Sequence, residues 1–96
     1  MWFYTKRNGQ SNMDARARFT NYGHFLPAAN STYDMGDSSY RWRNVYTNDL
    51  HLSNKGHTND VDGTWGDWTI QEGESALFLT INRSGKKFAI TMKEVS

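Results

Sequence analysis

The segment NDVDGTWGD at residues 59–67 holds the side chains whose types and spacing come closest to a binding site. Asp60, Asp62 and Asp67 could supply the oxygen ligands that calcium prefers. The glycine that follows the second aspartate would allow the sharp turn of such a loop. The segment lacks the glutamate and the alternating ligand set of a calcium-binding loop, so turn chemistry is the favoured interpretation. We expect neither a metal nor a cofactor.

Three residues could be combined into a catalytic set. His51, Ser53 and Asp60 are the residue types of a nucleophilic triad. No nucleophile-elbow sequence or paired-base spacing singles them out. His51 and His57 also do not form an H-x-H metal pair, although a three-fold axis could assemble one histidine from each of three chains. We therefore expect a protein that is not an enzyme.

Two tryptophans at the end of the polar segment indicate a different chemistry. Trp65 and Trp68 are separated by a glycine and an aspartate, which places aromatic rings beside acidic groups. Such rings can stack on a sugar while polar groups bond its hydroxyls. The favoured interpretation is that these rings, Trp68 especially, close the core beneath the loop; in the binding interpretation Trp65 is the better candidate for exposure. The candidate surface-binding residues are Trp65, Asp67, Asp62 and Asp60.

The segment DMGDSSYRWRNVY concentrates aromatic and basic side chains in a region that begins as a turn. These side chains could stack on bases and pair with phosphates, as in proteins that bind single strands. Only two arginines are local, however, and the formal charge of the whole chain is +1. The favoured interpretation is structural: Trp42, Val45 and Tyr46 anchor a long loop on a sheet, while the arginine stems lie along the surface. We expect no nucleic-acid partner.

The length of 96 residues favours a single domain, 1–96, with a small core. Hydrophobic residues make up 36% of the chain and cysteine is absent, so disulfides and thiolate metal sites cannot support that core. Association with other chains is the remaining support. Apolar runs such as 76–79 are far shorter than a membrane span, and no leader pattern opens the chain. We expect no membrane insertion.

The chain reads as almost entirely β. Residues 1–27 predict a hairpin and meander, with a two-residue turn at Asn8-Gly9, an alternating strand from Met13 and a short strand stopped by Pro27. Residues 28–54 are predicted to form a loop that carries the anchor motif, and the end of this range is predicted to be a weakly alternating strand. Residues 55–67 form a polar excursion, and residues 68–96 form the C-terminal strands and a hairpin.

The C-terminal hairpin is the clearest predicted element. Its turn at 82–85 fits a three-residue loop with a left-handed glycine, which pairs Asn82 with Lys86 and places Thr80 opposite Phe88. This register leaves both faces of the hairpin apolar, so both need cover. A neighbouring subunit is the economical cover, and an internal sandwich of one chain is the alternative. The expected oligomer interface consists of Leu77, Leu79 and Ile81 on one face and Phe78, Phe88 and Ile90 on the other.

Two segments resemble proteins of bacteriophage tails. The segment FLPAANSTYDMGDSSYRWRNVYTNDLHLSN is similar to one recurrent in tail fibres, with the core pattern D-[LIM]-G-x-S-x-x-R-[WF]-x-[ND]-[IVL]-Y. The segment WTIQEGESALFLTINRSGKKFAITMKEV resembles the C-terminal ends of structural proteins of marine phages, particularly those that infect cyanobacteria. Together the two segments cover most of the chain from Gly23 onward.

The resemblance implies an all-β, intertwined or side-by-side homotrimer in the tail fibre of a virion, outside the cell. Its partners would be two further copies, other tail proteins and a host surface receptor such as a polysaccharide. A stand-alone carbohydrate-binding β domain stays open, as does a tailspike-like glycan hydrolase, for which the sequence places no carboxylate pair. No self-cleaving chaperone domain follows Val95 and no virion-attachment region precedes Trp2, so we expect a distal fibre fragment or a short free-standing relative.

Overall fold

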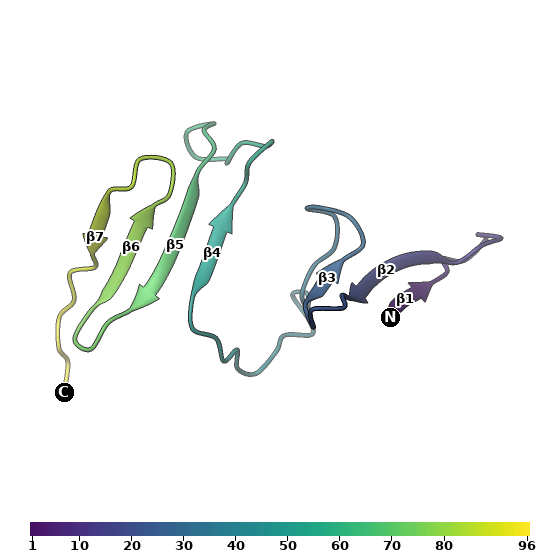
Figure 1. Cartoon of the computed structure of the whole chain (residues 1–96), viewed down its shortest axis with the longest axis horizontal. Helices are drawn as coiled ribbons and strands as arrows, with labels where there is room; N and C mark the ends of the chain where they lie inside the picture. Colours follow the sequence, from purple (N-terminus) through teal and green to yellow (C-terminus); the bar gives the residue numbers. More distant parts are fainter. The chain divides into compact units, whose positions relative to one another are not determined.

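The computed structural model describes all 96 residues and contains seven β-strands (Figure 1). The strands form two antiparallel sheets, one of three strands and one of four, so the predicted all-β, antiparallel fold is confirmed. No helix is present that could cross a membrane. The chain divides into two compact units, Met1–Arg43 and Asn44–Ser96, and each unit contains one sheet. A single domain over the whole chain stays a prediction.

The first unit contains the three-stranded sheet, in the order β1-β2-β3. Alternation of small apolar and charged residues produces its central strand. Its last strand ends at Pro27, and the Ala28 amide makes one further bond to the Arg16 carbonyl at 2.8 Å. Because Pro27 has no amide hydrogen, it suits this edge strand, which has no neighbour on its outer side. The predicted strands of the first 27 residues are therefore present. Their bounds are β1 (Trp2–Thr5), β2 (Asp14–Phe19) and β3 (Phe25–Pro27).

The loop between β1 and β2 is longer than the sequence predicts. Asn8-Gly9 does form a turn, with Gly9 at a φ of 81°. The two strands nevertheless begin to pair only at Thr5 and Asp14. The side chain of Gln10 gives the reason, because it accepts a bond from the Arg7 amide at 2.9 Å and donates one to the Asp14 carboxylate at 2.6 Å. These local bonds replace strand pairing, and the predicted two-residue hairpin is wrong.

The two faces of the three-stranded sheet differ in character. Phe3, Phe19 and Phe25 form an aromatic cluster on one face, with ring centroids 4.8 to 6.1 Å apart. Arg18 lies on the opposite face, with its guanidinium carbon 4.8 Å from the centroid of the Trp2 ring. The three phenyl rings are 43 to 52% exposed, so this apolar cluster remains accessible to water.

The second unit contains the four-stranded sheet, in which consecutive strands are neighbours (Figure 1). The polar excursion 54–66 joins its first two strands, close to the predicted range. A tight turn joins the next two, where the Gly73 amide donates to the Ala76 carbonyl at 2.7 Å. The bounds of the strands are β4 (Leu50–Ser53), β5 (Asp67–Glu72), β6 (Leu77–Ile81) and β7 (Lys87–Ala89).

The C-terminal hairpin pairs one residue out of the predicted register. Phe88 pairs with Leu79, whereas the sequence placed it opposite Thr80. Because successive side chains of a strand point to opposite faces, this shift moves Phe88 to the face of Leu79. The predicted register is therefore wrong, and the predicted composition of both faces is wrong with it.

The length of the turn explains the shift. The Ile81 amide donates to the Lys86 carbonyl at 2.9 Å, so the loop contains four residues instead of three. The predicted left-handed glycine is present, since Gly85 has a φ of 78° and its amide donates to the Ile81 carbonyl at 2.8 Å. The left-handed conformation of Gly85 was thus predicted correctly, but the residue of β6 that pairs with Lys86 was not.

The observed pairs divide the four-stranded sheet into an apolar face and a polar face. Leu52 pairs with Trp68, and Ile70 pairs with Leu50 on one side and Leu79 on the other. Directly paired residues share a face of an antiparallel sheet, and the remaining members follow by alternation. The apolar side chains of this face are those of Leu50, Leu52, Trp68, Ile70, Leu77, Leu79, Ile81, Phe88 and Ile90, and Glu72, which pairs with Leu77, lies on the same face at the end of β5.

The opposite face of this sheet is mostly polar, which corrects the prediction of a hairpin that is apolar on both sides. Phe78 is the one predicted interface residue that lies here, where it pairs with Ala89 and Gln71. The polar side chains of this face are those of His51, Ser53, Asp67, Thr69, Gln71, Thr80 and Lys87.

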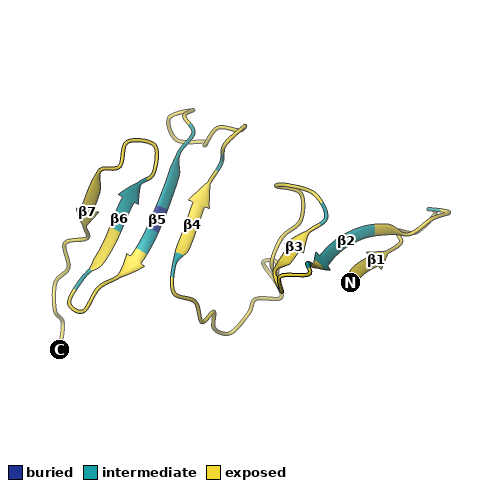
Figure 2. Ribbon diagram, in the orientation of Figure 1, coloured by how far each residue is buried: buried dark blue, intermediate teal, exposed yellow.

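The chain on its own buries no apolar side chain. Its one buried residue is Thr69, which is 6% exposed and lies in the middle of β5, the only dark blue position in Figure 2. Members of the apolar face are half-buried at the centre of the sheet and exposed toward its edges. A single sheet cannot cover its own face, because a hydrophobic core needs a second layer.

Candidate binding site

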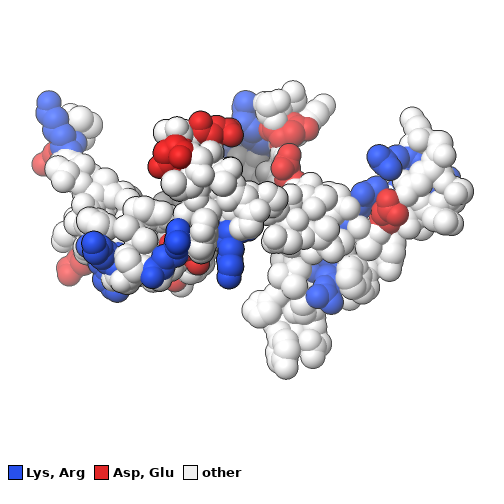
Figure 3. All heavy atoms as spheres, turned by 90° about the horizontal axis from the view of Figure 1, so that it is seen from above, with Lys and Arg blue, Asp and Glu red and all other residues white.

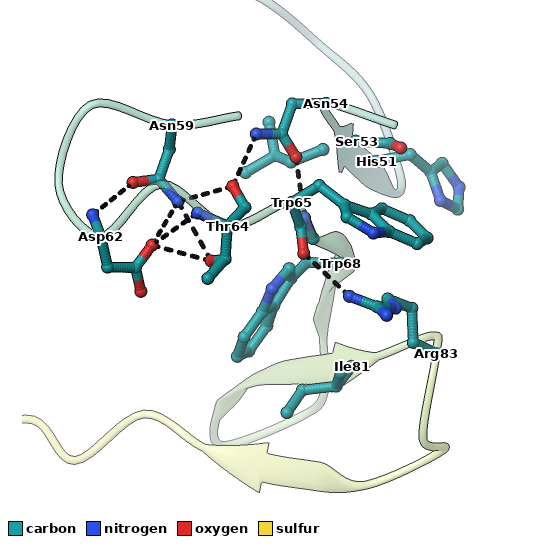
Figure 4. A pocket seen from close by; sticks show the side chains of 12 residues that line it. His51, Ser53, Asn54, Asn59, Asp62, Thr64, Trp65, Trp68, Ile81 and Arg83 are labelled. Atoms are coloured by element: carbon teal, nitrogen blue, oxygen red, sulfur yellow. Dashed lines mark hydrogen bonds between the residues drawn. The ribbon is translucent and has the colours of Figure 1, made fainter. Parts of the chain in front are cut away.

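A hollow lies where the excursion 54–66 meets the end of the four-stranded sheet (Figure 4). Its volume is about 760 Å³, and all the residues that line it belong to the second unit. The lining combines two indole rings, Trp65 and Trp68, with the charged side chains of Asp62 and Arg83. We call this cavity the Trp65 hollow.

Two asparagine side chains hold the excursion in shape. Asn54 closes its base, because its Oδ1 accepts the Gly66 amide at 2.8 Å and its backbone amide donates to the Gly66 carbonyl at 3.3 Å. Asn59 shapes its tip, where its Oδ1 accepts the Asp62 amide at 2.9 Å. Short polar side chains of this kind bond to nearby backbone and stabilise turns. The excursion is therefore an ordered loop that positions the residues of the hollow.

Asp62 is bound into the same network. Its Oδ1 accepts bonds from the Thr64 hydroxyl at 2.7 Å, the Asn59 side-chain amide at 2.8 Å and the Thr64 amide at 3.1 Å. The Thr64 hydroxyl, followed by the Asn59 amide, lowers the pKa of the Asp62 carboxyl below its usual 3.8, because these bonds stabilise the charged form. Asp62 is thus ionised at neutral pH, and its Oδ2 has no partner in the chain.

Arg83 completes the hollow from the turn between β6 and β7. Its guanidinium carbon lies 3.8 Å from the centroid of the Trp65 ring, and its Nη1 donates to the Trp65 carbonyl at 3.0 Å. A stacked guanidinium and a hydrogen bond together restrict both side chains. The sequence alone does not indicate Arg83 as a binding residue, because only the pairing of β5 with β6 brings this turn beside the excursion.

The two indole rings have different surroundings and point in different directions (Figure 4). Trp65 is half-buried instead of exposed as the binding interpretation expected, because Arg83 stacks on its ring. Trp68 is also half-buried and belongs to the apolar face, where it pairs with Ile81. A Cβ at Gly66 would come within 2.9 Å of the Trp68 Nε1, so the small residue there makes room for the ring.

The structure brings two of the four predicted surface-binding residues into the hollow. Trp65 and Asp62 line it, whereas Asp60 and Asp67 do not. Asp67 instead fastens the β6–β7 turn, since its Oδ1 accepts the Asn82 side-chain amide at 3.0 Å and its carbonyl accepts the Asn82 amide at 2.7 Å.

The residues considered for a triad do not form one hydrogen-bonded set. The His51 Nδ1 lies 2.9 Å from the Thr69 hydroxyl, and the Ser53 hydroxyl accepts the Lys55 amide at 3.3 Å. No hydrogen bond joins either residue to Asp60. No group of three or more histidine, cysteine or acidic side chains gathers in a way that could hold a metal ion.

The predicted anchor residues are exposed in the single chain. Trp42, Val45 and Tyr46 are 67%, 76% and 92% exposed, so they do not fix the loop to a sheet. The prediction that Trp42 anchors the loop on a sheet is wrong for the single chain. Short-range bonds shape the segment instead, as where the Asp37 carboxylate accepts the Tyr40 amide at 2.7 Å. Such bonds satisfy the backbone without any contact to a strand.

Charged side chains of both signs are distributed over the surface. On the face shown in Figure 3, basic and acidic groups are interspersed and separated by large uncharged areas. The only ion pair in the chain joins Arg16 to Asp14 at 3.7 Å. Arg83 therefore has no acidic partner, although it lies beside a hollow that also contains Asp62.

No protein-family model matches the chain, and neither a curated protein nor a solved structure is significantly similar to it. The features of the chain that bear on its function are therefore the geometry of the two sheets, the Trp65 hollow and the fibre-like sequence segments.

Proposed function

We propose that this chain is a module of a phage tail fibre, in which three copies associate through their β-sheets and the assembly contacts a host surface. The apolar face of the four-stranded sheet carries the proposal, because each of its nine apolar side chains is exposed or half-buried in the single chain. The two segments that resemble phage tail proteins support the same function.

The exposed apolar face has a large free-energy consequence. Full burial of one leucine, isoleucine or phenylalanine side chain contributes about 1.5–3 kcal/mol. The total stability of a small domain is only about 5–15 kcal/mol. Leu50, Leu52 and Phe88 are 48 to 51% exposed in the single chain, so covering these three side chains contributes roughly half of their full burial, about 2–4.5 kcal/mol together, which is a large part of that stability. This favours association over an isolated chain.

Identical copies are the simplest cover for this face. A closed cyclic arrangement brings the same surface of every chain to a common axis, so no second protein is required. The fibres that the sequence resembles are homotrimeric, which favours three copies. In this arrangement the apolar faces point toward the axis, and the polar face, with Gln71 and Lys87, stays in water.

The Trp65 hollow is the proposed point of contact with the host. Its Trp65 ring, which is not part of the apolar face of the sheet, can pack against the apolar face of a sugar, while Asp62 and Arg83 offer an acceptor and a donor for polar substituents. Surface loops placed on a rigid sheet are where binding residues concentrate.

The mass of the protein in solution tests the proposal. Sedimentation equilibrium over a wide range of protein concentration should give three times the chain mass of 11.1 kDa. A stable monomer at all concentrations would contradict association through the apolar face. A dimer or a tetramer would contradict the three-fold arrangement.

The Trp65 hollow also favours a second function, a carbohydrate-binding domain that acts as a single chain. A glycan array probed with protein of verified monomeric mass separates the two functions. Binding by the monomer would favour the stand-alone domain, whereas binding by the trimer alone would favour the fibre module.

A further inference from the structure

Arg83 has the properties of a residue prepared to bind an anion. A guanidinium has five N–H donors, and one bond to the Trp65 carbonyl is the only hydrogen bond that the Arg83 side chain makes. The Trp65 ring fixes the plane of the group, so little freedom is lost when a ligand binds. Arg83 is exposed and has no acidic partner in the chain. Its remaining donors match the two oxygens of a carboxylate.

On the other side of the hollow, Asp62 would contact a different chemical group of the same ligand. Asp62 lies away from Arg83 in Figure 4 and is held by its bonds to Thr64 and Asn59. Like any aspartate it is charged at neutral pH, so it repels a second anionic group. Its unbonded Oδ2 can accept a hydrogen bond from a hydroxyl. The ligand therefore needs an anionic end and a hydroxyl-bearing end.

The face of the Trp65 ring that Arg83 leaves uncovered supplies the third requirement, an apolar surface beside the two polar groups. The ring lines the hollow, whose volume of about 760 Å³ suits a small oligosaccharide. A sugar ring offers C–H groups to an aromatic surface and hydroxyls around its rim. We infer that the Trp65 hollow binds a carboxylate-bearing saccharide, with Arg83 on the carboxylate and Asp62 on hydroxyls. This inference deepens the proposed host contact and rests on it.

A glycan array of uronate-bearing and sialate-bearing oligosaccharides, each paired with its carboxyl-reduced neutral form, tests the inference. The full chain should bind acidic members and bind their neutral counterparts at least about tenfold more weakly, since a charge-assisted bond is lost. The variant Arg83→Gln should remove this preference. The matched control Lys87→Gln deletes a positive charge in β7 that does not line the hollow, and it should retain the preference.

A second variant and a folding control keep the result interpretable. Arg83→Lys keeps the charge but loses the planar fork, so it should bind more weakly than the parent and discriminate less. Far-ultraviolet circular dichroism and sedimentation should be unchanged in all three variants, because Arg83 and Lys87 are exposed. If Arg83→Gln unfolds, Arg83→Lys decides the outcome.

The possible results separate this inference from the proposed function. Equal binding of acidic and neutral glycans, binding of none, or an unchanged preference in Arg83→Gln would overturn the carboxylate site. A trimer that binds no acidic glycan would leave the fibre module standing without this site. A monomer that shows the Arg83-dependent preference would establish the site and contradict the trimeric fibre.

Discussion

The substitution Leu79→Asp tests whether the apolar face is covered in the assembly. Leu79 lies in β6 between Ile70 of β5 and Phe88 of β7, and it is half-buried in the single chain. Covering it with another copy would complete its burial. The aspartate would lose the burial of leucine, about 1.5–3 kcal/mol, and would place a carboxylate without a partner in an apolar interface, at a cost of several kcal/mol.

The combined loss exceeds about 5 kcal/mol for each chain, and every copy around the axis suffers it. A loss of this size is comparable to the stability of the whole fold. We therefore expect Leu79→Asp to abolish the trimer at any accessible protein concentration. Sedimentation equilibrium of the parent and the variant at matched concentrations measures this directly.

The neighbouring residue offers a matched control. Thr80 is adjacent in β6 but lies on the polar face, opposite Lys87, so Thr80→Asp should change stability by no more than about 0.5 kcal/mol and leave the mass unchanged. An unchanged mass for Leu79→Asp would refute the covered apolar face. Dissociation of both variants to the same extent would refute the assignment of the two residues to different faces.

Two further predictions follow from the hairpin and the excursion. The chain has no cysteine, so the double variant Thr80→Cys with Lys87→Cys should form a disulfide in mild oxidant. The double variant Thr80→Cys with Phe88→Cys should not, since only the first pair of residues shares a face. Equal disulfide yields by mass spectrometry would contradict the register. The pKa of the Asp62 carboxyl is lowered in the folded chain, so its charge stabilises the excursion. This stabilisation is fully present above the usual pKa of 3.8 and is lost as the pH falls through the lower pKa of the folded chain. The Thr64 amide signal should therefore titrate in nuclear magnetic resonance spectra with a midpoint below 3.8, and a midpoint at or above 3.8 would contradict the bond to Asp62.

The two units of the chain share one property, an apolar sheet surface that is exposed in the single chain. The three-stranded sheet also has an apolar surface, formed by Phe3, Phe19 and Phe25, that the single chain leaves accessible to water. Trp42 and Tyr46 are likewise exposed. An assembly of several copies would offer cover to all of these side chains, which is why the mass in solution is the most informative measurement.

Local features of the structure could be predicted from the sequence. The β character, the end of β3 at Pro27 and the left-handed Gly85 depend on the residues concerned and their immediate neighbours. The excursion was predicted within one residue of its observed bounds because polar residues and glycines dominate it. Its internal bonds through Asn54 and Asn59 use the same side chains that identified it as a loop.

The register of the C-terminal hairpin was decided by the tertiary structure. A three-residue and a four-residue loop both accommodate the left-handed Gly85, so the turn sequence is compatible with either register. Pairing across four strands selects the second, because it places Phe88 beside Leu79 and Ile81 in one continuous apolar face. A single residue of shift reverses which side chains share a face.

The residues of the Trp65 hollow likewise include some that a single sequence segment could indicate and one that only strand pairing brings there. The sequence by itself indicated the indole and the acidic residues of one continuous segment, and two of these, Trp65 and Asp62, line the hollow. It could not identify Arg83, which is 18 residues from Trp65 in the chain. Strand pairing alone brings the two together, because the free energy that aligns β5 with β6 comes from backbone bonds and apolar contacts along the whole sheet.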